Sequence, residues 1–178
     1  MHREDREPGT KDTILETGRL YLRYQRAGDV EPLVALWTDP EVTRYLGGPR
    51  DRAWLEGVFA ETARDPRGEP YDLWVVEEKA TGRVVGHCGL LDKEVEGAAE
   101  IELTYVVARD AWGQGYATEM ARALCHHAFA ALGLRRLISL IEPENAPSAR
   151  VAEKVGMHLD REVVRPGGAL RRVYIVEA

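Results

Sequence analysis

The chain has 178 residues, of which 44% are hydrophobic and 30% are charged. These values are ordinary for one folded domain with a single core. No apolar run approaches the ~20 residues that cross a bilayer, so no membrane association is expected. The net charge of −6 disfavours a general nucleic-acid binder, which needs a concentrated basic surface, and mildly favours cationic partners such as amines.

Residues 1–12 are charged and contain no apolar stretch, which excludes a secretory signal. They predict a disordered tail before a single domain over residues 13–178, located in the cytoplasm. Cys88 and Cys125 lie in apolar surroundings and predict two buried thiols in a reducing compartment. His126 and His127 would point about 100° apart on a helix, so no metal site is expected.

Residue periodicity predicts alternating layers of strands and helices. In the strand 99–107, alternation places Glu100 and Glu102 on one face, opposite an apolar face. Seven strands and four helices in this order predict a mixed α/β fold. In chain order the expected elements are a strand 19–24, helices 28–37 and 51–63, strands 71–77, 83–91 and 99–107, a helix 117–132, a strand 137–141, a helix 145–155 and a hairpin of 162–165 and 171–176.

A glycine-rich loop, Trp112–Ala117, joins the strand 99–107 to the most amphipathic helix of the chain. Its glycines let the backbone approach a ligand closely, and the first N–H groups of a helix lack internal partners. Together these features predict an anion site suited to phosphate. Neither the Walker pattern nor the complete dinucleotide fingerprint is present. A tight turn with glycines used only for packing is the structural alternative.

The loop resembles the acyl-CoA-binding motif of the GCN5-related N-acetyltransferase (GNAT) superfamily, Gln/Arg-x-x-Gly-x-Gly/Ala. Gly115 and Ala117 match its last two key positions, whereas Trp112 departs from the usual Gln or Arg. The departure is typical of the ribosomal-protein serine/alanine N-acetyltransferase-like (RimJ/RimL-type) branch. That branch pattern, Trp-Gly-x-Gly-x-Ala-x-Glu, is also matched by Gly113 and Glu119.

A second motif strengthens the resemblance. Residues 145–157 resemble the branch's Asn-x-x-Ser-x-x-Val-x-Glu-Lys-Leu-Gly-Phe helix, and residues 17–23 resemble its opening strand. The resemblance covers about residues 14 to 177. It implies the GNAT fold, an α/β (α+β) architecture with a mixed central sheet of about six to seven strands, about four flanking helices and splayed central strands.

The resemblance implies acetyl-CoA as a co-substrate and no metal. Its pyrophosphate would lie on the loop, and its pantetheine arm would pair with the end of the preceding strand. The residues expected to bind it are Val106, Val107, Trp112, Gly113, Gln114, Gly115, Tyr116, Ala117, Thr118 and Asn145. The alternative role for Asn145 is a plain helix N-cap.

Transfer to an amine also needs a base and a proton donor. Glu102 is the first choice for the base and Glu100 the second; the alternative for both is a solvated strand face or a structural ion pair. In this branch Ser148 is a candidate donor to the thiolate. Many other superfamily members use a Tyr four residues further along, where this chain has Ala152.

The expected function is therefore acetyl-CoA-dependent N-acetylation of a primary amine by direct attack on the thioester. An α-amino group, with a pKa of about 7.7–8.0, is deprotonated more easily than a lysine at about 10.4. The acceptor is either a protein N-terminus or a small molecule, including an aminoglycoside or a polyamine. A non-catalytic acyl-CoA-binding or regulatory module is the alternative of a different class. The family also permits a homodimer.

Overall fold

The computed structural model describes residues 12–178. The predicted tail thus falls outside the described residues except for Asp12, whose carbonyl accepts the Tyr24 N–H. The elements are β1 (Thr13–Glu16), β2 (Leu20–Arg23), η1 (Ala27–Asp29), α1 (Val30–Thr38), α2 (Arg52–Thr62), β3 (Leu73–Glu78), β4 (Val84–Val95), β5 (Ala98–Val107), η2 (Arg109–Ala111), α3 (Tyr116–Ala130), β6 (Arg136–Ile141), α4 (Ala146–Lys154), β7 (His158–Val164) and β8 (Leu170–Glu177).

The strands form one sheet in the order β1-β2-β3-β4-β5-β6-β8-β7. Neighbouring strands are antiparallel except β5 and β6, which are parallel because α3 crosses between them. The predicted mixed α/β architecture is confirmed, with eight strands instead of the expected six to seven. The additional strand, β1, has only four residues, which is too short for an alternating pattern to distinguish it from a loop.

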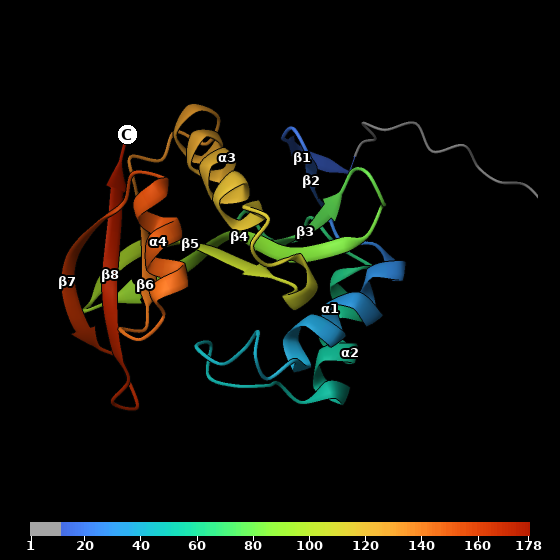
Figure 1. Cartoon of the computed structure of the whole chain (residues 1–178), viewed down its shortest axis with the longest axis horizontal. Coiled ribbons are helices and arrows are strands. Elements are labelled where there is room, and N and C mark those ends of the chain that lie inside the picture. Colours follow the sequence, from blue (N-terminus) through green and yellow to red (C-terminus); the bar gives the residue numbers. More distant parts are fainter. Residues whose placement is uncertain (1–11) are drawn as a thin grey trace, which may run out of the picture.

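The helices cover the two faces of the sheet in pairs. On one face, α3 and α4 pack over the largest apolar cluster, which includes Leu103, Leu124 and Leu137. On the other face, α1 and α2 pack together against Val75 of β3 and Val106 of β5. Figure 1 shows these two helix pairs well apart, on either side of the long strands β4 and β5. A ligand in the middle of the sheet would therefore lie between the two pairs.

Both cysteines are buried and free, as predicted. Burial raises the pKa of Cys88 to about 12 and that of Cys125 to about 11, so neither is a thiolate near neutral pH. None of the helices within residues 12–178 is long and apolar enough to cross a membrane.

Gly89 in β4 is required for close backbone packing. A Cβ atom at this position would lie 1.9 Å from the carbonyl oxygen of Asp72, which leads into β3. We expect Gly89→Ala to lower the free energy of unfolding by about 2 kcal/mol, because backbone must move to remove the clash. Gly57→Ala is the matched control: nothing lies within 4 Å of its Cβ position in α2, so this change should stabilise the helix by up to about 1 kcal/mol. Urea unfolding of both variants measures the difference, and equal stabilities would contradict the prediction.

Candidate active site

Strands β5 and β6 diverge in the middle of the sheet. Although they are parallel neighbours, only Glu102 and Ile138 are paired in register. The other neighbour of β5, β4, pairs with it along its whole length, from Gly86↔Val107 to Val95↔Ala98. The splay implied by the resemblance is confirmed, and Glu102 lies where it begins.

The backbone groups that face the gap can be assigned from the ladder with β4. The Ala108 N–H donates to the Val85 carbonyl of β4 at 2.8 Å. Because the backbone groups of successive strand residues point to opposite sides, those of Val106 also face β4, whereas those of Tyr105 and Val107 face the gap. Of the two residues named from the sequence, Val107 is therefore placed to pair with a ligand in the gap and Val106 is not. Tyr105 joins it.

Side chains replace the ladder where the strands separate. In this register the next ladder bond would join the Leu140 N–H to the Leu103 carbonyl. Instead, the Leu140 N–H donates to the Glu102 carboxylate at 3.2 Å, and the Ser139 hydroxyl donates to the Leu103 carbonyl at 2.7 Å. Both backbone groups are satisfied without closing the gap, which makes the splay a stable feature of the fold.

Glu102 is a largely buried carboxylate, with 13% of its side chain exposed. Burial raises its pKa, and the nearby Lys93 ammonium, 3.6 Å away, and the Leu140 N–H offset part of this rise. Glu100 lies two residues further from the gap and forms an ion pair with Arg136 at 3.2 Å. Both carboxylates therefore form ion pairs, as the structural alternative expected, and they differ in position: only Glu102 lies at the splay.

The opposite face of the gap is bounded by Tyr105 and the start of α4. The Tyr105 hydroxyl donates to the Ser148 carbonyl at 2.8 Å, and burial raises the pKa of Tyr105, so the phenol keeps its proton. The Ser148 N–H donates to the Asn145 side-chain oxygen at 3.2 Å. Asn145 is thus the N-cap of α4, the alternative role considered for it. That Tyr105 borders the gap was not predicted from the sequence. The strand alternation, which places Tyr105 on the same face as Leu103, was the only feature of the sequence that pointed to it.

The glycine loop has a backbone conformation that suits the binding of an anion. Gly113 and Gly115 have φ values of +75° and +80°, which only glycine adopts without strain, and neither is crowded. The glycines therefore serve the backbone conformation and not close packing. Trp112 is 49% exposed, and its indole N–H donates to the Val107 carbonyl at 2.8 Å, which ties the loop to the strand end.

The remaining predicted loop residues differ in exposure. Gly115 is the N-cap of α3, so the first N–H groups of this helix lie within the loop. This set of backbone donors fits a pyrophosphate. Gln114 is exposed, Ala117 and Thr118 are half-buried, and the Tyr116 side chain is buried. Within residues 12–178, no three His, Cys, Asp or Glu side chains form a potential metal-binding group.

The face with α1 and α2 is hollowed in two places. One hollow of about 800 Å³ lies between α1 and the ends of β4 and β5, lined in part by Leu36, Arg83 and Ala108. A smaller one of about 180 Å³ lies against α2 and includes Trp54 and Asp72. The Glu102 side chain is on this same face because it alternates with that of the adjacent apolar row. Glu102 is not among the residues that line either hollow.

A family model for the acetyltransferase (GNAT) domain matches residues 19–158. The chain belongs to this family. The uncharacterized protein YkkB of Bacillus subtilis (strain 168) is 36% identical to it over 152 residues, covering 85% of this chain and 88% of YkkB. The uncharacterized N-acetyltransferase p20 of Bacillus licheniformis is 30% identical, covering 90% and 93%. With its GNAT domain and N-acetyltransferase relatives, this chain is an acetyltransferase.

Solved GNAT structures share the fold. The acetyltransferase of Agrobacterium tumefaciens str. C58 superposes with a TM-score of 0.77 at 28% identity, covering 99% of this chain and 100% of that one. A putative ribosomal-protein-serine acetyltransferase from Vibrio cholerae, 23% identical, has a TM-score of 0.71 and covers 92% and 96%. The spermidine N-acetyltransferase SpeG of Vibrio cholerae, 17% identical, has a TM-score of 0.69 and covers 90% and 95%. The last two establish only a common fold.

Proposed function

We propose that this chain binds acetyl-CoA with the pyrophosphate on the loop Trp112–Ala117 and transfers the acetyl group directly to a primary amine on the α1/α2 face. The observation that carries the proposal is Glu102, a largely buried carboxylate placed where the strands separate. In a protein that only bound acyl-CoA, Glu102 would accept the Leu140 N–H and do nothing more; in the proposed enzyme it would also accept a proton from the amine. Such a non-catalytic module is the alternative.

The co-substrate would be held by backbone groups. The N–H groups of the loop and the first turn of α3 would donate to the pyrophosphate. The gap-facing groups of Tyr105 would pair with the pantetheine arm as an added strand does, with Asn145 beside it; the Val107 carbonyl, which already accepts the Trp112 indole N–H, has a second lone pair for the same arm. Acetyl-CoA supplies an activated acyl thioester. The Val107 N–H is the donor that we assign to the charge developing on the carbonyl oxygen.

Proton transfers would take place on opposite faces of the sheet. On the α1/α2 face, Glu102 accepts a proton from the acceptor ammonium, directly or through water, and burial brings its pKa closer to that of the amine. On the α3/α4 face, the Ser148 hydroxyl is the candidate donor to the departing thiolate; it would regain its proton from solvent, to which the nitrogen releases its second proton as the amide forms. The neutral Tyr105 phenol holds the first turn of α4 in place through the Ser148 carbonyl. Separate faces keep the base from protonating the leaving group.

The acceptor would enter beside the α1/α2 face. A protein N-terminal α-amine or a small-molecule amine suits the acidic chain, since opposite charge attracts a cation over long range. The pKa of an α-amine is lower than that of a lysine by about 2.5 units, which favours an N-terminal or small-molecule amine over a lysine side chain. The aminoglycoside and polyamine classes are the competing acceptors, and a direct comparison of these amines decides between them.

A panel of amines tests the proposal. Acetyl-CoA should raise the melting temperature of the protein, and free thiol should be released with at least one of three acceptor classes: N-terminal peptides, polyamines and aminoglycosides. Binding without thiol release for any amine would support the non-catalytic module. Absence of binding would exclude both functions.

A matched pair of glycine variants localises the binding. Gly115 and Gly133 both have positive φ, +80° and +68°, at opposite ends of α3. Alanine at either position introduces similar backbone strain. We expect Gly115→Ala to raise the KM for acetyl-CoA at least tenfold, and Gly133→Ala to leave it unchanged, as measured by thiol release. Equal KM values for the two variants would rule out the loop as the binding site.

A further inference from the structure

A cluster of hydrogen bonds holds the glycine loop from the side of β2. The Glu119 carboxylate, in the first turn of α3, accepts three hydrogen bonds and forms an ion pair. One oxygen accepts the Thr17 hydroxyl at 2.6 Å and the Arg19 N–H at 3.0 Å; the other accepts the Arg19 guanidinium Nε at 2.7 Å and lies 2.6 Å from its Nη2. A single side chain thus joins α3 to a segment 100 residues earlier in the chain.

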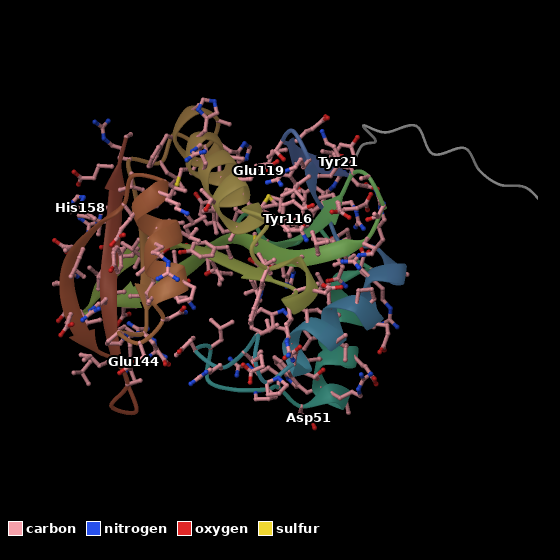
Figure 2. All side chains as sticks on the ribbon, viewed as in Figure 1. Tyr21, Asp51, Tyr116, Glu119, Glu144 and His158 are labelled. Carbon is pink, nitrogen blue, oxygen red and sulfur yellow. The ribbon has the colours of Figure 1, made fainter. Side chains whose placement is uncertain are left out.

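Arg19 extends the same contact to the loop itself. Its Nη1 donates to the Gln114 carbonyl at 2.9 Å, and its guanidinium carbon lies 4.6 Å from the centre of the Tyr116 ring. The Tyr116 hydroxyl in turn donates to the Glu78 carboxylate at the end of β3. Figure 2 shows Tyr116 and Glu119 together at the beginning of α3, on the side toward β2, where Tyr21 lies.

The bond to the Gln114 carbonyl sets the direction of the next amide. In a trans peptide the carbonyl and the following N–H point in opposite directions, and no peptide bond in the described chain is cis. With the Gln114 carbonyl turned toward Arg19, the Gly115 N–H points away from Arg19. Arg19 therefore fixes the orientation of an amide that an anion on the loop would need.

The pair also balances charge at the helix start. Burial pushes the pKa of Glu119 upward, but the hydrogen bonds from Thr17 and Arg19 outweigh this effect and leave the pKa below its ordinary value, so the carboxylate is ionised. An unpaired negative charge in the first turn of α3 would repel an anion bound at the same helix end. The Arg19 guanidinium offsets that charge.

We propose that Arg19 and Glu119 are positioning residues for the pyrophosphate site: they orient the Gly115 amide and keep the helix start free of uncompensated negative charge. The inference rests on the proposed function, because the loop must bind acetyl-CoA for these residues to matter to catalysis. Neither residue is assigned a contact with the reacting atoms.

Binding and steady-state kinetics of Arg19→Met test the inference. We expect Kd and KM for acetyl-CoA to rise about tenfold, while kcat at saturating acetyl-CoA and KM for the amine change less than twofold. In Arg19→Met/Glu119→Gln the unpaired charge is gone, so part of the lost affinity should return. Arg19→Lys keeps a charge beside Glu119 without the planar reach to Gln114 and should lie between wild type and Arg19→Met.

Arg52→Met is the matched control, because Arg52 has similar exposure and pairs with Glu31 and Glu56 on the surface of α1 and α2. It should leave acetyl-CoA affinity unchanged. Wild-type protein that fails to bind acetyl-CoA would overturn the proposed function itself. Wild-type binding with unchanged affinity in Arg19→Met and Arg19→Lys would overturn only the positioning role. A parallel fall in kcat, affinity for both substrates and melting temperature would also overturn it, by showing a purely structural contact.

Discussion

Glu102→Gln is expected to lower kcat about 100-fold, the usual minimum for removing a general base. The amide has nearly the same shape and still accepts the Leu140 N–H, so the fold and the affinity for acetyl-CoA should stay within about threefold of wild type. Thiol-release kinetics at saturating acetyl-CoA measure the change in kcat, and calorimetric titration measures the affinity. Unchanged turnover would exclude Glu102 as the base.

The pH dependence gives an independent check on the same residue. A base works only when deprotonated, so activity should fall as pH drops through the Glu102 pKa. Burial raises that pKa, which places the acidic limb above the range of an ordinary glutamate, and Glu102→Gln should remove this limb. Glu100→Gln is the matched control: it breaks the ion pair with Arg136 and should change kcat less than threefold.

Acidification is expected to destabilise the fold by about 3 kcal/mol through His87 alone. His87 is fully buried between Trp37 and Leu73, and burial lowers its pKa from 6.5 to about 4. The Trp37 indole N–H can only donate, so it donates to Nδ1 at 3.1 Å, and Nε2 carries the proton that faces the Leu73 carbonyl at 3.0 Å. Protonating Nδ1 would place a second N–H donor opposite the Trp37 indole N–H, and neither donor would have an acceptor.

The direction of the effect follows from the two states of the chain. His87 binds a proton below pH 6.5 in the unfolded chain, but only below about pH 4 in the folded chain. The contribution of His87 to stability is thus complete at neutral pH and is lost between these two values.

A variant that cannot titrate isolates this contribution from that of the carboxylates. His87→Gln should be less stable than wild type at pH 7, and the gap between the two free energies of unfolding should shrink by about 3 kcal/mol by pH 4. Denaturant unfolding of both proteins between pH 7 and pH 4 measures the difference in their free energies of unfolding. Parallel curves for the two proteins would show that another group controls acid stability.

Local patterns were sufficient for most of the architecture. Seven strands, four helices and the glycine loop could be placed because each has its own period or turn residues within a dozen positions. The exception was β1, which is recognisable only through its pairing with β2. The splay between β5 and β6 was expected from the family resemblance and not from any local pattern, and only the structure gave its one paired position, Glu102 with Ile138.

By itself the sequence determined the family, the loop proposed to bind the acetyl donor and a short set of candidate residues, because the motifs at Trp112–Ala117 and 145–157 are local. Only the tertiary structure placed Glu102, and not Glu100, where β5 and β6 separate, and brought Tyr105 to Ser148. It alone joined Arg19 to Glu119. The physical reason is that periodicity indicates which face of an element a side chain occupies. The packing of the sheet and helices determines which residues, tens of positions away, contact that side chain, and these contacts set its pKa.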